Sequence, residues 1–232
     1  GNVSERGEQT NPLQMLGGQF KTTVVAPDYG GVKNPRTLGE EAQSINPSHF
    51  GFLDPMHTPE SERTGVTLHL GSAVRKVGKD LIVHVHDLQT GKLVPLNTVD
   101  FHHAEVVLPD PVTWKDGKPV PYAKNVKVKL PGGDVDIRPY SKARYVLPSA
   151  KGMFDFASNL IPFLPCDQGN RTSMADKQME QAISLKAREA PLVQSSVHSN
   201  RPEHTYEKMV GRFSSTVSPV DGKVVAIKGD AV

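Results

Sequence analysis

The sequence predicts an α+β fold in which an irregular, mixed part is interrupted by an inserted β-rich unit. The 232-residue chain contains 20 glycines and 19 prolines, and this punctuation favours short strands and irregular connections over long helices. Short β-branched runs separated by Gly-containing turns fill residues 73–148. Only residues 170–185 form a long stretch without Gly or Pro, and its apolar spacing is helical.

The first 72 residues are predicted to be irregular, with little regular structure. Residues 11–16 predict a short helical turn closed by two glycines, and the β-branched residues 20–25 predict a strand. Residues 28–47 are typical of a long exposed loop. The next segment carries prolines at intervals of a few residues, which fix an irregular backbone of the kind that positions side chains. Residues 66–70 predict a further strand.

The β-rich unit is expected to be a compact antiparallel sheet or barrel. Its turns are expected at Gly91, Gly117 and Gly132-Gly133. An apolar, helix-like run resumes at residues 153–157, so the unit is predicted to be inserted into another domain. The predicted strands are residues 81–86, 101–108, 125–130 and 135–137.

The stretch after residue 158 is where we expect the function. Asp167 is the predicted N-cap of a helix with one apolar face, made by Met179, Ala182 and Ile183. Free N–H groups at the helix start, beside an amide and a guanidinium group, are suited to hold an anion. The alternative, an ordinary solvated amphipathic helix, is favoured by this stretch taken alone. The opposite face carries Asn170, Met174, Lys177 and Gln181.

After Leu185 the chain is predicted to be irregular as far as Arg212. Residues 213–227 predict a hairpin that turns at Asp221-Gly222. The chain begins with Gly1 and not with Met, so we expect a processed or excised piece of a longer protein.

Composition excludes several classes of protein. The 27 basic and 25 acidic residues give a net charge of +2, too balanced to indicate nucleic-acid binding by charge alone. The single cysteine, Cys166, excludes an internal disulfide, indicates a reducing compartment and is interpreted as a small buried hydrophobic residue, because no signature of an activated thiol surrounds it. No apolar run of membrane-spanning length is present, and no signal peptide is expected.

Four histidines offer a metal site that the sequence supports only weakly. His84 and His86 share one strand face, and His102 and His103 are expected on a neighbouring strand. No cysteine and no well-spaced carboxylate completes a ligand set, so no metal is expected. No phosphate-binding loop, dinucleotide fingerprint or Ser-His-Asp order is present either.

Three separated stretches, in the same order, resemble the β subunit of multisubunit DNA-dependent RNA polymerase. The first is Asn11-Pro12-Leu13, followed by Gly30-Gly31, and the second is residues 47–51 leading to Thr58-Pro59-Glu60. The third is residues 157–164, then Asp167, Asn170-Arg171, Met174, Gln181-Ala182 and residues 191–193. The resemblance covers residues 11 to about 230 and is least supported in the β-rich insert.

The resemblance implies a division of the chain. Residues 1–72 would be the first half of the fork region at the active centre, and residues 73–148 an inserted external domain. Residues 149–195 would be the second half of the fork, with the nucleotide-contacting helix. Residues 196–232 would begin the β-rich hybrid-binding region.

The resemblance also implies roles for single residues. Asn170, Arg171 and Met174 would contact the incoming nucleoside triphosphate. No catalytic residue falls within the chain, because the family's Asp triplet that holds Mg²⁺ belongs to the β′ subunit. Thr58, Pro59, Glu60, Arg63, Lys177 and Gln181 would lie near the RNA.

The implied function is a nucleotidyltransferase complex that is inactive as this chain alone. Its partners would be the remaining β and β′ subunits or fragments, template DNA, nascent RNA and nucleoside triphosphates, with no membrane. The alternative is a noncatalytic nucleic-acid-binding or structural protein that retains the fork as a scaffold. Retention of Asn170 together with Arg171 favours the polymerase.

Departures from the family's pattern predict a divergent enzyme. Arg63 and Lys177 stand where the family has amides, and this divergence predicts a split or phage-encoded polymerase, located in the host cytoplasm or the virion. The family's His-Lys-Arg-Arg run becomes residues 20–23, Phe-Lys-Thr-Thr. The loss of two guanidinium groups predicts insensitivity to rifamycin.

Overall fold

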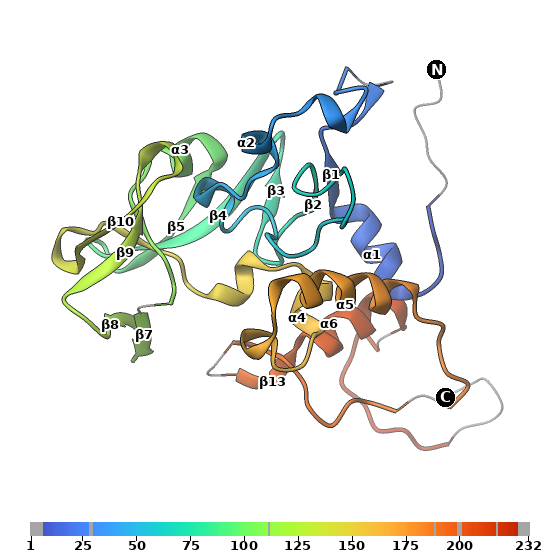
Figure 1. Cartoon of the computed structure of the whole chain (residues 1–232). Coiled ribbons are helices and arrows are strands. Elements are labelled where there is room, and N and C mark those ends of the chain that lie inside the picture. Colours follow the sequence, from blue (N-terminus) through green and yellow to red (C-terminus); the bar gives the residue numbers. More distant parts are fainter. Residues whose placement is uncertain are drawn as a thin grey trace.

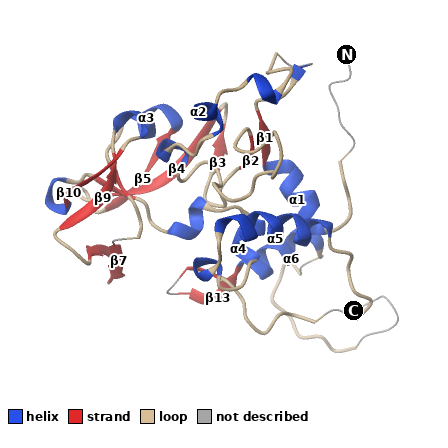
Figure 2. Ribbon diagram, in the orientation of Figure 1, coloured by secondary structure: helices blue, strands red, loops and turns tan. Residues whose placement is uncertain are grey.

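The computed structural model describes residues 7–27, 30–110, 112–187, 189–198, 201–216 and 218–226. Helices and sheets are both present, which confirms the mixed α+β class. The large sheet lies at one end of the molecule, and helices α1, α4, α5 and α6 gather at the other (Figure 1). Figure 2 shows the same separation, with long loops joining the two ends. None of the described helices is long and apolar enough to cross a membrane.

A seven-stranded sheet forms the β-rich end, with the order β10-β9-β6-β11-β4-β3 and with β5 paired to β4. Every pairing is antiparallel except β11 with β6. The β7–β8 hairpin pairs separately. The boundaries predicted for the insert stay a prediction. The strands are β3 (Arg75–Val77), β4 (Asp80–Asp87), β5 (Lys92–Asn97), β6 (Val106–Val107), β7 (Val112–Lys115), β8 (Lys118–Pro121), β9 (Asn125–Lys129), β10 (Val135–Pro139) and β11 (Tyr145–Val146).

Both faces of the sheet are buried at its centre. On one face Val83 and Val85 of β4 pack in a cluster with Phe101 and with Phe52, which belongs to the N-terminal segment. The Phe52 and Phe101 rings meet edge to face, with centroids 5.2 Å apart. Burying such a side chain contributes roughly 1.5–3 kcal/mol, so Phe52 ties the sheet firmly to the irregular part. The other face buries Val107, Val112, Val126, Val128 and Val146.

A helix, α3 (Thr98–His103), takes the first three residues of the strand predicted at residues 101–108, of which β6 (Val106–Val107) remains a strand. The Asn97 side chain caps it by accepting from the Asp100 N–H, and the ammonium group of Lys129 donates to the last carbonyls, those of Phe101 and His102. Capping at both ends thus stabilises the helix, while the β-branched Val106 and Val107 still form strand β6. His102 is therefore on a helix and not on a strand beside β4, so that prediction was wrong.

The N-terminal part begins with α1 (Pro12–Phe20), which is longer than predicted because it continues through both glycines. Strands β1 (Lys21–Thr23) and β2 (Thr67–His69) lie within the two strands predicted at residues 20–25 and 66–70, and the structure pairs them antiparallel, which the sequence did not predict. Between these strands the backbone is mostly irregular, with a short α2 (Glu40–Gln43). Within the described parts of the chain, 3₁₀ turns lie at Pro35–Thr37, Pro47–His49, Pro131–Gly133, Tyr140–Lys142, Ala150–Met153 and Leu164–Cys166.

The C-terminal part contains α4 (Phe156–Leu160), α5 (Gly169–Gln181) and α6 (Tyr206–Ser214), which pack with α1. Strands β12 (Ser196–His198) and β13 (Arg201–Thr205) pair antiparallel within the stretch predicted to be irregular. The hairpin predicted at residues 213–227 is wrong for the part of it that the structure describes. Residues 213 and 214 belong to α6, and residues 215, 216 and 218–226 contain no strand; residues 217 and 227 lie outside the described residues.

Candidate functional site

A cavity of about 540 Å³ lies between the irregular N-terminal segment and the start of α5. Two stretches far apart in the sequence form its opposite walls. A cavity of this size is within the range of small-molecule sites. The lining residues are Gln43, Ser44, Ile45, His49, Leu53, Asp54, Pro55, Met56, Thr58, Pro59, Glu60, Thr64, Gly65, Leu68, Gly169, Asn170, Ser173 and Met174.

The cavity brings together five residues that the sequence singled out. Thr58, Pro59 and Glu60 line it from the loop, and Asn170 and Met174 line it from α5. The resemblance is the only signal in the sequence that connects these two groups.

Arg171 lies beside the cavity and does not line it. Its guanidinium group is exposed, and Nη1 donates to Met174 Sδ at 3.6 Å. Arg63 and Lys177 do not line the cavity either. The Arg171 guanidinium group is therefore solvent-exposed and adjacent to Met174, which lines the cavity.

The start of α5 faces this cavity without a side-chain cap. The N-cap is Gln168, whose side chain makes no capping bond, and not the predicted Asp167, which accepts from the Gln168 N–H. The first N–H groups of a helix have no partner within the helix. Gly169 allows Met56 to pack closely against the start of α5, because a Cβ at position 169 would lie only 3.3 Å from Met56 Sδ. The arrangement leaves donors available to an anionic ligand.

The loop wall is held by the hydroxyl of Thr58. Thr58 Oγ1 donates to the Thr67 carbonyl at 3.1 Å and accepts from the Gly65 N–H at 2.9 Å. This hydroxyl is therefore occupied by the protein itself. Glu60 is exposed and carries the free carboxylate of the wall.

The buried face of α5 is polar, which the sequence reasoning missed. Thr172, Ser173 and Asp176 are its buried residues. The predicted apolar face is wrong, since α5 ends at Gln181 and Ile183 is 84% exposed. The helix packs on a polar loop and on α4, so hydrogen bonds take the place of apolar contacts.

Asp54 is the centre of the loop beneath α5. Its Oδ1 accepts from the N–H groups of Met56 and His57, and its Oδ2 accepts from the Asp155 N–H and the Ser158 hydroxyl, both at 2.7 Å. Burial and the nearby Asp155 charge raise the pKa of Asp54 to about 6. The carboxylate thus joins the loop to the start of α4.

His57 is buried between two carboxylates. Its Nδ1 lies 2.5 Å from Asp155 Oδ2, and its Nε2 lies 3.5 Å from Glu180 Oε2. Burial lowers the pKa of His57, but the bonds and charges of Asp155 and Glu180 outweigh burial and raise it to about 10. The positive imidazolium in turn holds the pKa of Asp155 below its usual range, against the opposing effect of burial.

His57, His69 and Asp155 place nitrogen and oxygen atoms within 4.8 Å of one another, a grouping that metals use. The two imidazole rings are stacked, however, with centroids 3.6 Å apart and planes 12° apart. A metal bound in the plane of one ring would lie far out of the plane of the other. The geometry favours a hydrogen-bonded cluster. The described residues do not bring His84, His86, His102 and His103 together in such a group.

The N-cap pattern is the signal that would have found part of this cluster. Asp155 precedes the apolar run of α4 and caps it by accepting from the Ser158 N–H at 2.8 Å. Nothing in the spacing of Asp54, His57 and Asp176 predicts that they meet. Cys166, interpreted as buried, is exposed, because the Pro-rich turn that carries it lies at the surface.

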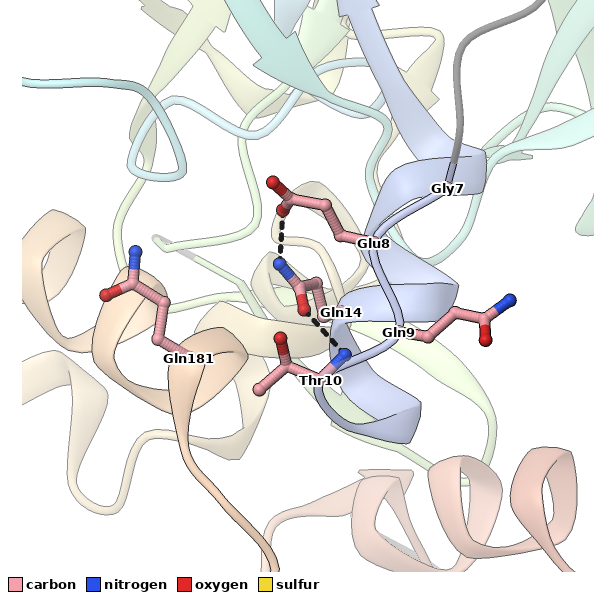
Figure 3. Close-up of a pocket in the computed structure, with 6 residues that line it drawn as sticks. All are labelled: Gly7, Glu8, Gln9, Thr10, Gln14 and Gln181. Atoms are coloured by element: carbon pink, nitrogen blue, oxygen red, sulfur yellow. Dashed lines mark hydrogen bonds between the residues drawn. The ribbon is translucent and has the colours of Figure 1, made fainter.

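Gln181 lies apart from the 540 Å³ cavity. It lines a second, open pocket together with residues 7–10 and Gln14 (Figure 3). There the Gln14 side chain is held between Glu8 and Thr10: its Nε2 donates to Glu8 Oε2, and its Oε1 accepts from the Thr10 N–H at 3.0 Å. The structure therefore separates Gln181 from Asn170 and Met174.

Comparison with known proteins gives one match to a family model, which covers the N-terminal part of the chain. Residues 7–75, which include α1 and the loop wall, match the family model described as RNA polymerase Rpb2, domain 3. That match defines the class of protein that the N-terminal part resembles.

Curated relatives extend the similarity to 98% of the chain. The DNA-directed RNA polymerase subunit beta of Prochlorococcus marinus (strain AS9601) is 30% identical over 241 residues, which cover 21% of that protein. The proteins of the same name from Corynebacterium jeikeium (strain K411) and Leifsonia xyli subsp. xyli (strain CTCB07) are 26% identical over 232 residues and 27% identical over 240, each covered to 20%. The chain spans about a fifth of the length of these relatives. The matches support its resemblance to a β-subunit segment.

Proposed function

We propose that this chain is a piece of the β subunit of a DNA-directed RNA polymerase, and that its cavity helps to position the incoming nucleoside triphosphate and the nascent RNA. The observation that carries the proposal is the shared cavity of Thr58–Glu60 with Asn170 and Met174. The resemblance implies nucleotide and RNA contacts for these same residues. The curated relatives are named as β subunits of this enzyme.

The chemistry of the cavity suits a triphosphate. The uncapped N–H groups at the start of α5 and the Asn170 amide offer neutral donors, and Arg171 beside the cavity adds a charged fork for phosphate oxygens. Glu60 on the opposite wall is anionic and repels phosphate. The triphosphate is therefore expected at the α5 side, with the uncharged 3′-hydroxyl end of the growing RNA towards Glu60.

Mg²⁺ does not fit the residues of this cavity. Its carboxylates are Asp54 and Glu60, and both oxygens of Asp54 already accept hydrogen bonds from the protein. Glu60 alone does not make a divalent-metal site. We propose that a partner subunit holds the Mg²⁺, that the remaining β and β′ parts, template DNA and RNA are the other partners, and that the chain is inactive alone.

The test is nucleotide addition by the complete polymerase that contains this chain. Arg171→Ala is expected to raise the KM for nucleoside triphosphates by roughly ten- to a hundredfold, for the loss of one charge-assisted contact. Arg212→Ala, at an exposed position of α6, is the matched control. The isolated chain with Mg²⁺ is expected to synthesise no RNA. Unchanged kinetics in both Arg171→Ala and Asn170→Ala would refute the nucleotide contact and favour the scaffold alternative.

A further inference from the structure

Ser158 of α4 links the polar face of α5 to the loop. Ser158 Oγ lies 2.7 Å from Asp54 Oδ2 and 3.1 Å from Asp176 Oδ2. These residues come from the loop, from α4 and from α5, and each is fully or almost fully buried. The serine is therefore the point at which three separate segments meet.

A hydroxyl group carries one proton and donates one hydrogen bond at a time. Two carboxylates contact Ser158, so one of these contacts needs a proton from the acid side. Asp54 already accepts from three backbone N–H groups, which favours its ionised form and directs the Ser158 proton to it. The remaining contact is satisfied if Asp176 carries a proton and donates it to the Ser158 oxygen.

The surroundings of Asp176 agree with a neutral acid. The residue is 0% exposed, and its Oδ1 has no hydrogen-bond partner among the described residues. A carbonyl oxygen tolerates this position far better than a charged oxygen does. Burial raises the pKa of Asp176 to about 8; His57 opposes this effect, and the Asp155 and Asp54 charges add to it.

We propose that Asp176 is a positioning residue that works as a proton donor: the bridge Asp176–Ser158–Asp54 holds α5 against the loop and so fixes the distance between the two walls of the cavity. Met174 and Asn170 lie on the same 13-residue helix as Asp176. Asp54 fixes the loop that leads to Thr58, because it accepts from the N–H groups of the two residues that follow Pro55. The link to nucleotide binding rests on the function proposed above.

Several charged groups face the bridge. Asp54 and His57 face it from the loop, Asp155 from the start of α4, and Glu180 from the next turn of α5, where it also contacts His57. His57 is expected to keep its proton well above pH 7, since its pKa is about 10. Comparison of the wild type with Asp176→Asn therefore separates the effect of the Asp176 proton from the effects of the neighbouring charged groups.

The sign of the pH effect follows from the direction of the shift. The folded-state pKa of Asp176, about 8, lies above the usual 3.8, so its proton stabilises the fold fully below pH 4. That contribution is lost as the pH rises towards 8. Relative to Asp176→Asn, whose amide donates to Ser158 at every pH, the unfolding equilibrium constant of the wild type should rise up to about tenfold for each pH unit in this window.

The first experiment measures the proton directly on the 232-residue chain. Carbon-13 NMR of labelled aspartate should show one carboxyl group, absent in Asp176→Asn, that titrates near pH 8. Unfolding by urea at several pH values then compares the wild type with Asp176→Asn. Asp80→Asn removes an exposed carboxylate of β4 and is the matched control for loss of one charge. Titration of Asp176 in the ordinary carboxyl range, or parallel pH profiles of wild type and Asp176→Asn, would overturn the proposal.

The second experiment measures the nucleotide KM of the complete polymerase. Asp176→Ala and Ser158→Ala should raise it at least several-fold at pH 7, and Asp176→Asn should restore it to the wild-type value. An effect of Arg171→Ala without an effect of Asp176→Ala would overturn the positioning role and leave the proposed function intact. If neither Arg171→Ala nor Asp176→Ala changed the nucleotide KM, the proposed function itself would be refuted.

Discussion

The side chain of Asn11 links the start of α1 to the end of α5, and its removal should lower the free energy of unfolding. Its Oδ1 accepts from the Gln14 N–H at 2.9 Å and caps the start of α1. Its Nδ2 lies 2.8–2.9 Å from the carbonyls of Met179, Glu180 and Ala182, at the end of α5. The amide therefore serves a helix start and a helix end whose residues are 168 or more positions apart.

Two substitutions separate the two functions of this side chain. Loss of an N-cap costs about 1 kcal/mol, and each of the two amide protons of Asn11 contributes about 1 kcal/mol of net hydrogen bonding. Asn11→Ala should lower the free energy of unfolding by roughly 2–4 kcal/mol. Asn11→Ser keeps an acceptor for the cap and loses the donors, so it should cost roughly 1–2 kcal/mol.

Urea unfolding followed by circular dichroism measures both values. The matched control is Asn34→Ser, because Asn34 caps only its own 3₁₀ turn and is exposed. That variant should change the free energy of unfolding by less than about 0.5 kcal/mol. If Asn11→Ser proved as stable as the wild type, the bonds to the end of α5 would contribute nothing, and the reasoning would be refuted.

Two further predictions concern the N-terminal part. Gly18→Ala should stabilise α1 by up to about 1 kcal/mol, whereas Gly17→Ala should lose that gain, because a Cβ at Gly17 would lie 2.2 Å from Glu180 Oε1 and push it from His57. Equal gains in urea unfolding would show that Glu180 does not depend on Gly17. The polymerase containing this chain should transcribe at rifamycin concentrations that silence a bacterial enzyme, since the hydroxyls of residues 22 and 23 are short and already bonded across the β1–β2 pair. Host-like sensitivity in a transcription assay would contradict this expectation.

Local signals predicted the elements whose bonds are local. The β4 strand, its turn at Gly91 and the β9–β10 hairpin follow from β-branched alternation and from glycines with positive φ. The two glycines at 30 and 31 also have a clear cause: Gly30 has a φ of 80°, and a Cβ at Gly31 would lie 2.6 Å from the Val24 carbonyl oxygen.

The features that the sequence did not predict depend on hydrogen bonds between residues that are far apart in the chain. Helix α3 is capped at its end by Lys129, which lies 27 or 28 positions along the chain from the carbonyls that it caps. The buried face of α5 is polar because Asp54 and Ser158 reach it from other segments. The apolar spacing along α5 does not show which residues of other segments pack against it, and the buried face was therefore assigned to the wrong residues.

Phe52 gives the β-rich end a mechanical role. Its ring is part of the core of the sheet, and the next two residues, Leu53 and Asp54, line the cavity. The sheet therefore supports the cavity. Deletion of residues 73–148 would remove most of the side chains that pack against Phe52 and would leave the loop wall without that support. A partner that tilted the sheet would move Phe52, and this movement would reach the cavity wall at once, because Leu53 and Asp54 directly follow Phe52 in the chain.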